Sequence, residues 1–509
     1  MNGSVAIVGG GLAGMTAALR LLERGVHVTL IEATHRLGGK AGADQHGAGW
    51  DEHGWHLFPL WYLNIWHLAD ELEIRNHFVD RTRYAYMRPG AYPQTVYLEN
   101  PFSWRTALHN IFNGVLPPPE ALLYQYVLLD LMSQPVRVRA RLDQVTVNGF
   151  ARSRFYCTDS VVDQLEDTVS RASAIESYEM SAMTVRNVMR YWFKYHDPWF
   201  RVLNGDLQTR FIAPFENKLR ALGCVIRTNC IVESVVTEGR KARALCIRAA
   251  GAEILETVPV DNLLVAVAAE DFRLLITPSL QAAAPTLGGL FYLRSRVMAG
   301  MTIRMKHRVS GIPAGHVNFT DTPYELSIID VTELWGFDKT VLCVVCSDYT
   351  TLQAHSPEQG REILVAELQR YLPFLRGDNV EAIDFQPHVE HPLFANTAGA
   401  WPYRPKSQTE LENLFVAGVY CQSAVDLTCM EGAVSTGLQA AEALRQRLGL
   451  EREISVLVPD VHPRAYLVLL KLLLLPVAIG ALLWTKVRSL LGSRVSSTAQ
   501  DGAKDRGAV

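Results

Sequence analysis

The chain has neither a strong net charge nor a regular arrangement of cysteines. Among 509 residues, Lys and Arg number 49 and Asp and Glu number 52, so the net charge is −3. This balance lacks the basic excess of a nucleic-acid-binding protein, and a hydrophobic content of 49% excludes a wholly disordered chain. The eight cysteines show no framework spacing, which favours reduced thiols in a reducing cytoplasm. We expect a globular protein without a nucleic-acid partner.

Sequence signals for several common chemistries are also missing. No G-x-S-x-G and no Walker lysine motif is present, and residues 1–4 lack the positive region of a signal peptide. Cys343 and Cys346 form a C-x-x-C in an apolar run, but residues three apart on a strand point to opposite faces. His53 and His56 are spaced like a pair of metal ligands, but no third ligand stands at the spacing of a known metal-binding motif. We predict no metal site, and we expect His56 to be neutral and to hydrogen-bond or line the active site.

The beginning of the chain carries a dinucleotide-binding pattern. A short apolar strand leads into Gly9-Gly10-Gly11-Leu12-Ala13-Gly14, and a helix, a second strand and Glu32 follow in that order. Gly9 permits a tight turn, Gly11 lets a pyrophosphate approach the backbone, and Gly14 lets the helix pack closely on the strand. The helix N-terminus then faces the phosphates, and Glu32 accepts a hydrogen bond from a ribose hydroxyl. The complete order predicts dinucleotide binding.

A second glycine pair distinguishes between the possible dinucleotides. Glu32 is followed by Arg36-Leu37-Gly38-Gly39-Lys40, which offers another close backbone approach to the phosphates. Domains that bind only NAD usually lack this pair, whereas one large family of FAD proteins has it. The pattern therefore favours FAD, with a plain surface turn as the alternative.

Apolar strands that could extend the same sheet are dispersed along the chain, with long insertions between them. This dispersal predicts an α/β fold in which a doubly wound, Rossmann-like FAD-binding domain is built from discontinuous segments, beside a mixed α+β substrate domain. The expected FAD-binding domain comprises residues 1–80, 204–290 and 401–450, and the expected substrate domain comprises residues 81–203 and 291–400.

The end of the chain contains an apolar run of membrane-span length. Residues 465–484 carry one charge, at Lys471, and we expect residues 461–491 to form a membrane-associating helix and residues 492–509 a disordered tail. If the run spans the membrane, the positive residues after 484 lie on the non-cytoplasmic side, although positive residues near a span favour the cytoplasmic side. A bent interfacial anchor keeps both flanks cytoplasmic, with Lys471 reaching the headgroups. A buried core helix is the third possibility.

Five stretches, covering roughly residues 4–450, resemble the FAD-dependent amine-oxidase superfamily, and within it the plant and cyanobacterial phytoene and ζ-carotene desaturases. The stretches are the glycine-rich start with residues 36–39, residues 52–74, residues 179–214, residues 223–235 and residues 413–434. One position departs from the pattern: Val419 stands where the family has an acidic residue that contacts the ribityl chain of the flavin.

The resemblance implies a set of FAD contacts. Glu32 would bind the adenosine ribose, the backbone of Val232 would hold the adenine, and residues Gly54 to His56 would border the isoalloxazine ring. The pyrophosphate would be lined by Gly9, Gly11, Gly14, Gly39 and Lys40, and the ribityl region would be held by Glu431 with Gly432. The other residues expected to bind the cofactor are Leu12, Ala13, Arg36, Gly38 and Gly418. Arg210 matches an arginine of the flavin pocket, where it would steady charge, and is the candidate catalytic residue.

The resemblance also implies a reaction. FAD accepts a hydride at N5, and a hydrophobic isoprenoid or carotenoid-like substrate gains a double bond. A membrane quinone is the expected electron acceptor, and lipid at the cytoplasmic face of a membrane is an expected partner through residues 465–484. The alternatives are a flavin amine oxidase, an FAD-dependent isomerase or dehydroxylase of a lipid, and a non-catalytic flavin-binding membrane protein. The sequence leaves the oligomeric state open.

Overall fold

A five-stranded parallel sheet forms one half of the protein. The structure is a computed structural model that describes residues 3–46, 49–52, 54–135 and 139–504, so His53 lies outside the described residues. The strand order is β10-β2-β1-β14-β22, and all neighbouring pairs are parallel. The bounds are β1 Ser4–Val8, β2 His27–Ile31, β10 Val225–Arg227, β14 Leu263–Val265 and β22 Leu414–Val416. The expected Rossmann-like α/β fold class is confirmed.

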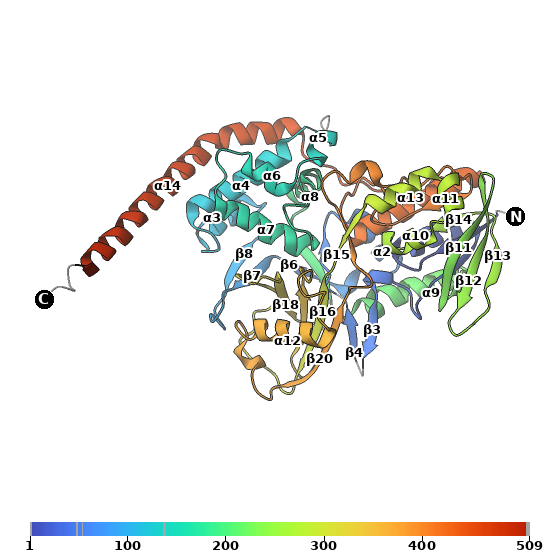
Figure 1. The fold of residues 1–509 in the computed structure, drawn as a ribbon, viewed down its shortest axis with the longest axis horizontal. Helices are drawn as coiled ribbons and strands as arrows, with labels where there is room; N and C mark the ends of the chain where they lie inside the picture. Colours follow the sequence, from blue (N-terminus) through green and yellow to red (C-terminus); the bar gives the residue numbers. More distant parts are fainter. Residues whose placement is uncertain (1–2, 47–48, 53, 136–138, 505–509) are drawn as a thin grey trace.

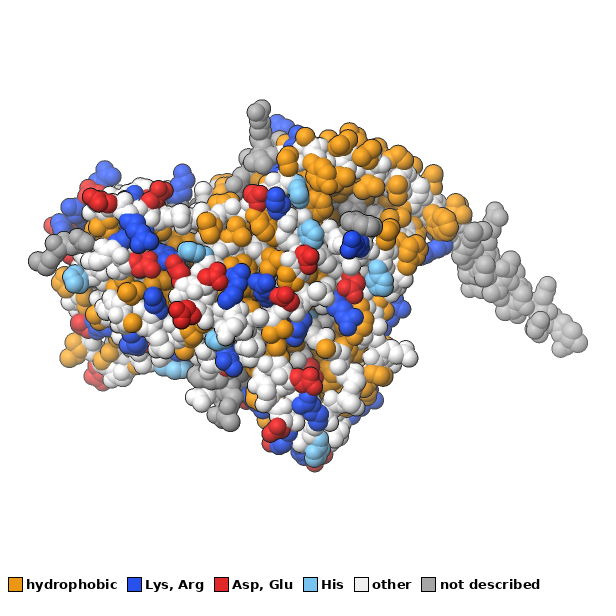
Figure 2. Space-filling model, turned by 180° about the vertical axis from the view of Figure 1, so that it is seen from behind, with side chains coloured by type: hydrophobic (Ala, Val, Ile, Leu, Met, Phe, Trp, Pro, Cys, Tyr) orange, Lys and Arg blue, Asp and Glu red, His pale blue; other side chains and the backbone are white. Residues whose placement is uncertain are grey.

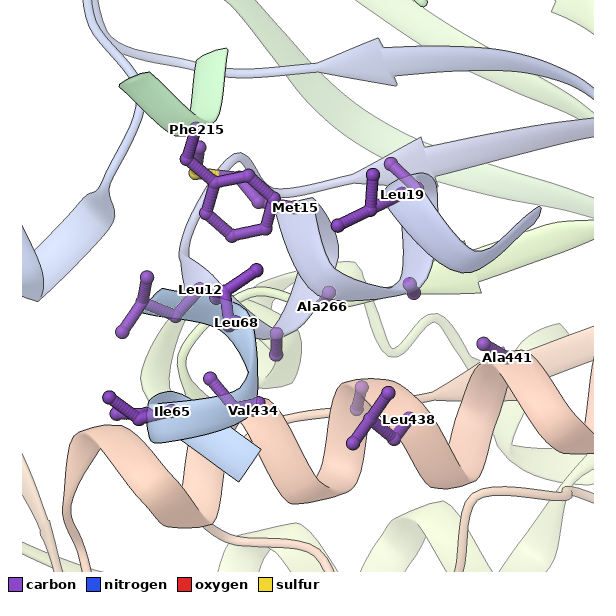
Figure 3. Close-up of a cluster of buried hydrophobic side chains, with 14 of the residues drawn as sticks. Leu12, Met15, Leu19, Ile65, Leu68, Phe215, Ala266, Val434, Leu438 and Ala441 are labelled. Carbon is purple, nitrogen blue, oxygen red and sulfur yellow. The ribbon is translucent and has the colours of Figure 1, made fainter. Parts of the chain in front are cut away.

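Two helices pack together against this sheet. They are α1 (Leu12–Leu22) and α13 (Met430–Leu448), and α2 (Leu63–Glu71) also packs on α13. Figure 3 shows Met15 and Leu19 of α1, Leu438 of α13 and Leu68 of α2 in one buried cluster. This apolar cluster fixes α1, and with it the glycine-rich turn that precedes α1.

A seven-stranded sheet forms the core of the other half (Figure 1). Its order is β20-β16-β19-β18-β17-β7-β8, and β17 and β7 are parallel whereas the other pairs are antiparallel. The bounds are β7 Arg83–Met87, β8 Val96–Glu99, β16 Ala299–Met305, β17 His316–Phe319, β18 Leu326–Asp330, β19 Val341–Cys346 and β20 Val380–Pro387.

A layer of helices stands beside this sheet, under the C-terminal helix (Figure 1). The layer consists of α3 Trp104–Phe112, α4 Pro118–Ser133, α5 Arg139–Asp143, α6 Val147–Arg152, α7 Asp159–Ser173 and α8 Ala182–Lys194. The remaining strands are β3 Ala43–His46, β4 Gly49–Glu52, β5 Phe58–Pro59, β6 Phe78–Arg81, β9 Phe200–Leu203, β11 Cys230–Glu238, β12 Lys241–Ala249, β13 Glu256–Pro259, β15 Arg294–Arg296 and β21 Leu393–Ala395. The remaining α-helices are α9 Ala213–Ala221, α10 Ala269–Leu275, α11 Pro278–Ala283 and α12 Pro357–Leu368.

The C-terminal helix α14 (Arg464–Lys504) is longer than the expected segment and continues into the stretch expected to be a disordered tail. Its part from Arg464 to Arg488 is long and apolar enough to cross a membrane, and 17% of the most apolar window is buried. The helix packs along α4, where Leu467, Ala478 and Ala481 are buried. Leu470, Leu475 and Leu482 are half-buried on the same side. Many other apolar side chains of the helix are exposed, and Figure 2 shows the hydrophobic surface that they form.

Three polar contacts also hold α14 to α4. The Lys471 ammonium lies 2.6 Å from a carboxylate oxygen of Asp130, whose side chain is 3% exposed. The Arg464 guanidinium donates to the Ser133 carbonyl at 2.9 Å, and the Arg488 guanidinium lies 3.5 Å from the Glu120 carboxylate. Lys471 therefore binds a protein carboxylate, and the expectation that it reaches the lipid headgroups is corrected. The order of the contacts makes the two helices antiparallel.

Candidate active site

A cavity of about 1540 Å³ runs between the two halves of the protein. One end is formed by the glycine-rich turns beside the parallel sheet, and the other end by apolar side chains of α3, α4, α7 and α8. The seven-stranded sheet contributes side chains of β7, β17, β18 and β19 between these ends. The cavity is therefore continuous from the candidate cofactor site to the helical layer.

The glycine-rich turn leaves backbone open to this cavity. Gly9 has φ +106°, and a β-carbon there would lie 2.6 Å from the Ala266 carbonyl oxygen. At Gly11 an added β-carbon would have no neighbouring atom within 4 Å, and no side chain caps the start of α1. Gly11 also forms a parallel bridge with Gly38, which brings the second glycine pair beside the first. Free N–H groups at a helix N-terminus suit a pyrophosphate.

Glu32 occupies the position that a ribose-binding acid requires. It follows β2 directly, lines the cavity and is 8% exposed. One carboxylate oxygen accepts the Gly10 N–H at 2.7 Å, and the other accepts the backbone N–H and the hydroxyl of Thr34, each at 2.8 Å. These donors fix the carboxylate at the edge of the cavity. With the open glycine backbone beside it, the site fits the adenosine half of FAD.

Two basic side chains lie beside the second glycine pair and line the cavity. The Arg36 guanidinium binds the Asp44 carboxylate at 2.6 Å. The Lys40 ammonium donates to the Pro392 carbonyl, and burial lowers the pKa of Lys40. Both cations are thus positioned by the protein near the expected pyrophosphate.

His56 lies at the cavity wall and is oriented by a buried acid. Its Nδ1 is 3.5 Å from a carboxylate oxygen of Glu52, whose other oxygen accepts the Leu207 N–H at 2.7 Å. Burial raises the pKa of Glu52. Among the described residues no group of three or more His, Cys, Asp or Glu is arranged to hold a metal ion. None of the eight cysteines, all of which the structure describes, forms a disulfide.

The family model for flavin-containing amine oxidoreductases matches residues 12–445. The chain belongs to this family. It is 24% identical to 15-cis-phytoene desaturase of Synechococcus elongatus, over 87% of this chain and 96% of that protein. It is 23% identical to zeta-carotene desaturase of Synechocystis sp., over 86% of this chain and 96% of that protein. The structure of cyclohexylamine oxidase from Brevibacterium oxydans superimposes with a TM-score of 0.64 at 15% identity, covering 88% and 99% of the two chains.

These similarities and the glycine-rich site make the protein an FAD-dependent oxidoreductase of the amine-oxidase family. Most residues expected to bind FAD line the cavity. They are Gly9, Gly11, Leu12, Ala13, Glu32, Arg36, Gly38, Gly39, Lys40, Gly54, His56, Val232 and Gly418. Gly14 lies behind this wall, where an added β-carbon would stand 2.0 Å from the Gly9 carbonyl oxygen. It allows the close packing of α1 that its place in the motif predicts.

The structure places Glu431 away from the cavity surface. Its side chain is fully buried, and its two carboxylate oxygens accept the backbone N–H groups of Asn64 and Ile65, each at 2.9 Å. The side-chain amide of Asn64 adds a bond at 2.6 Å. Burial raises the pKa of Glu431 to about 8. Glu431 therefore joins α13 to the N-terminus of α2, and Gly432 packs closely on the Leu427 carbonyl rather than lining the cavity.

Arg210 is likewise not among the described residues that line the cavity. It is an exposed residue of the short helical segment Gln208–Ile212, with its side chain over Gly205. Arg171 of α7 lines the substrate end instead. Its guanidinium donates to the carbonyls of Phe319 and Leu326, each at 2.6 Å, and pairs with the acids Asp167 and Glu325.

A set of polar side chains in the substrate end was not found from the sequence. Its members are Tyr86, Tyr124, Thr168, Arg171, His316, Asn318 and Ser327, all of which line the cavity. They come from α4, α7, β7, β17 and β18, and no sequence motif joins those elements. One sequence feature could have indicated this set, namely polar or aromatic residues at alternate strand positions. Such residues share a strand face, as Tyr84 does with Tyr86 and His316 does with Asn318.

Proposed function

We propose that this FAD-dependent oxidoreductase dehydrogenates a hydrophobic isoprenoid or carotenoid-like substrate at a membrane. The observation that carries the proposal is the continuous cavity of about 1540 Å³, which extends from the glycine-rich cofactor site into the apolar helical layer. A long hydrocarbon can lie along such a cavity with one segment beside the flavin. The printed names of the relatives, phytoene and zeta-carotene desaturases, support the same substrate class.

Bound FAD supplies the hydride acceptor for this chemistry. The protein binds and orients the substrate and keeps water away from the reacting carbon atoms. Trp192, Trp199 and Met189 contribute apolar wall near the middle of the cavity, and Leu128 and Ile111 contribute it toward α3 and α4. Removal of water strengthens the electrostatic interactions inside the site.

The surface around α3 suggests how a lipid reaches the cavity. Leu108 and Phe112 are 58% and 75% exposed, whereas Ala107 and Ile111 of the same helix line the cavity. Exposed apolar side chains of α14 belong to the same helical layer; they include Leu469, Leu472, Leu473, Leu483 and Trp484. An exposed apolar surface that extends over two helices is typical of a membrane-contacting face. The proposed entry for substrate is from the bilayer, beside α3.

We further propose that α14 lies in the plane of the membrane surface and does not span it. Arg464, Lys471 and Arg488 are held by α4 along the whole apolar segment. A spanning helix would have to break the buried Lys471–Asp130 ion pair, and loss of one partner from such a pair costs about 3–5 kcal/mol. The FAD-binding half is then expected on the cytoplasmic side, and a membrane quinone is the proposed electron acceptor.

Anaerobic flavin reduction tests the reaction. The protein is purified in detergent, its oxidised flavin spectrum is recorded, and C20 to C40 isoprenoids are added without oxygen. Bleaching of the flavin band, followed by its recovery on addition of a soluble quinone, is the expected result. Peroxide formation from amines in air, without bleaching by any isoprenoid, would contradict the proposal and favour an amine oxidase.

Vesicle flotation tests the membrane arrangement. The double variant Leu472→Glu/Leu483→Glu changes two outward-facing residues, and each change should weaken vesicle binding at least about tenfold because a buried leucine contributes about 1.5–3 kcal/mol. The matched control Ile254→Glu changes an 83% exposed residue on a loop far from α14 in sequence and should bind like the wild type. A protease-sensitive tag placed at the C-terminus should be cleaved on the same side of sealed vesicles as a tag at the N-terminus. Protection of the C-terminal tag alone would establish a spanning helix.

A further inference from the structure

The substrate end of the cavity contains a polar row on two neighbouring strands. β7 and β17 are parallel, and Asn318 pairs with Tyr86 in their register. Because alternate residues of a strand share a face, Tyr84 stands beside His316 and Tyr86 beside Asn318. All four side chains line the cavity. The row interrupts a wall that is otherwise suited to hydrocarbon.

Hydrogen bonds within this row fix the tautomer of His316. Its Nε2 lies 2.9 Å from the side-chain oxygen of Asn318, and Asn318 also hydrogen-bonds the Tyr86 hydroxyl. An amide oxygen only accepts, so Nε2 carries the hydrogen and Nδ1 presents a lone pair. Burial lowers the pKa of His316 to about 4, so the ring is neutral near pH 7.

The Nδ1 acceptor has no partner within the part of the chain that the structure describes. It is buried and makes no hydrogen bond, although its ring is held on two sides. The His316 ring stacks on Trp55 with centroids 5.2 Å apart and meets the edge of Tyr84 at 5.1 Å. A buried polar atom without a partner is costly. His316 lines the cavity, but Nδ1 itself is shielded from it, so a ligand group reaches Nδ1 only when the ring turns toward the cavity on binding.

The opposite wall is polar at the same end of the cavity. The Tyr124 hydroxyl of α4 lies 3.0 Å from the Thr168 hydroxyl of α7, and both side chains line the cavity. Tyr86 is close enough to Tyr124 and Arg171 for their charges to influence its pKa, which burial raises. These groups satisfy one another, whereas a substrate made only of carbon and hydrogen would leave Nδ1 of His316 without a partner.

We propose that the substrate is an isoprenoid that bears a hydroxyl group, and that this hydroxyl donates a hydrogen bond to Nδ1 of His316. The inference rests on the proposed function and specifies its substrate class. Trp55, on which His316 stacks, lies between Gly54 and His56, the residues expected to border the isoalloxazine. The hydroxyl end is therefore held toward the flavin, and the hydrocarbon chain extends toward α3 and α4.

Ligand binding without turnover tests this subsite. The probes are geranylgeraniol and a C20 hydrocarbon of the same skeleton without the hydroxyl, each titrated into the detergent-solubilised, FAD-loaded protein. Affinity is measured from tryptophan fluorescence and, independently, from perturbation of the oxidised flavin spectrum. We expect the wild type to bind the alcohol about tenfold more tightly than the hydrocarbon, the range set by one buried hydrogen bond.

Two histidine variants separate the subsite from general packing. His316→Phe keeps an aromatic ring against Trp55 and removes Nδ1, so it should abolish the preference and leave the hydrocarbon affinity within about twofold. His307→Phe changes an exposed histidine outside the cavity lining and should keep the tenfold preference. Rescue of the preference in His316→Gln, whose side-chain oxygen can accept, would identify the hydrogen bond as its cause.

The outcomes distinguish the inference from the proposed function. Equal affinity of the wild type for alcohol and hydrocarbon overturns the hydroxyl subsite and leaves the isoprenoid oxidoreductase standing. An unchanged preference in His316→Phe overturns the role of His316. If neither isoprenoid changes either signal, the proposed function and the inference both fail.

Discussion

The two ends of the cavity differ in whether backbone or side-chain atoms form the wall. The cofactor end consists largely of backbone: the turn at Gly9–Gly14 and the pair Gly38–Gly39 come close together. The charged side chains Glu32, Arg36 and Lys40 stand beside them. The substrate end consists of side chains from α3, α4, α7, α8 and the seven-stranded sheet. A backbone site tolerates very few added atoms, whereas a side-chain site tolerates volume changes but depends on charge and hydrogen-bond pairing. The predictions below test this difference.

The largest effect is expected at Gly14. A β-carbon there would stand 2.0 Å from the Gly9 carbonyl oxygen, and both partners are backbone that cannot move aside. Gly14→Ala should destabilise the protein by more than about 3 kcal/mol and prevent recovery of folded, yellow protein. The ratio of bound flavin to protein after purification measures the effect.

Gly11→Ala is the matched control, because an added β-carbon there meets no atom within 4 Å. This variant should fold with an ordinary melting temperature but bind FAD more weakly, since the methyl group occupies space beside the expected pyrophosphate. Equal behaviour of the two alanine variants would show that the cofactor end is not limited by backbone packing.

The next effect concerns a buried charge on α4, in the helical layer behind the substrate end of the cavity. The buried Asp130 carboxylate binds the ammonium of Lys471, the guanidinium of Arg154 at 2.9 Å and the hydroxyl of Tyr156 at 2.5 Å. Asp130→Ala leaves these groups without their common acceptor and should cost about 3–5 kcal/mol. Thermal unfolding, followed by release of flavin and by circular dichroism, measures the loss.

Asp378→Ala provides the comparison for Asp130→Ala. Asp378 binds Lys306 at 2.6 Å, the same distance, but its side chain is 95% exposed. The expected cost is at most about 1 kcal/mol because water screens the pair. A similar loss in both variants would mean that burial does not control the strength of the Asp130 contact.

A smaller, pH-dependent effect is expected at Glu431. Burial raises the pKa of this carboxyl from its ordinary 4.5 to about 8 in the folded protein. Between these values the folded state holds a proton that the unfolded state has released, so stability falls as pH rises from about 5 to 8. Glu431→Gln should reduce this slope and cost about 1–2 kcal/mol near pH 6 through one lost hydrogen bond.

Melting temperatures of both proteins from pH 5 to 9 measure the Glu431 effect. Glu325 and Glu176 have raised pKa values of about 7 and about 9 and give slopes of the same sign. The difference between wild type and variant therefore isolates Glu431. Parallel curves would show that Glu431 does not change protonation on folding.

The smallest effect is expected at Arg210, an exposed residue outside the cavity lining. Arg210→Ala should change stability by no more than about 0.5 kcal/mol and leave flavin content unchanged. The flavin-to-protein ratio and the rate of flavin bleaching measure this. A large loss of bleaching with normal flavin content would restore Arg210 as a candidate catalytic residue.

The contrast between the two ends also explains what could be predicted from the sequence. The turn at Gly9–Gly14 and its acid Glu32 lie within one short segment, so local spacing carries the geometry. The row at Tyr86, His316 and Asn318 is assembled from strands more than two hundred residues apart, and pairing of β7 with β17 cannot be derived from spacing. Glu431 shows a related limit. The resemblance placed it at the ribityl chain of the flavin, whereas the groups that bind it in the structure, on α2, follow only from tertiary packing.

The order of strands in the parallel sheet has a consequence for synthesis of the protein. The sheet needs β1 and β2 from the start of the chain and β22, which ends at Val416, from near its end. At translation rates of 5–20 residues per second, roughly 20–80 s separate the first strand from the last. During this interval the glycine-rich turn stands beside an incomplete parallel sheet. The apolar part of α14 leaves the ribosome later still, when α4 is already available, so the face that carries Leu467, Ala478 and Ala481 can be covered as soon as it emerges.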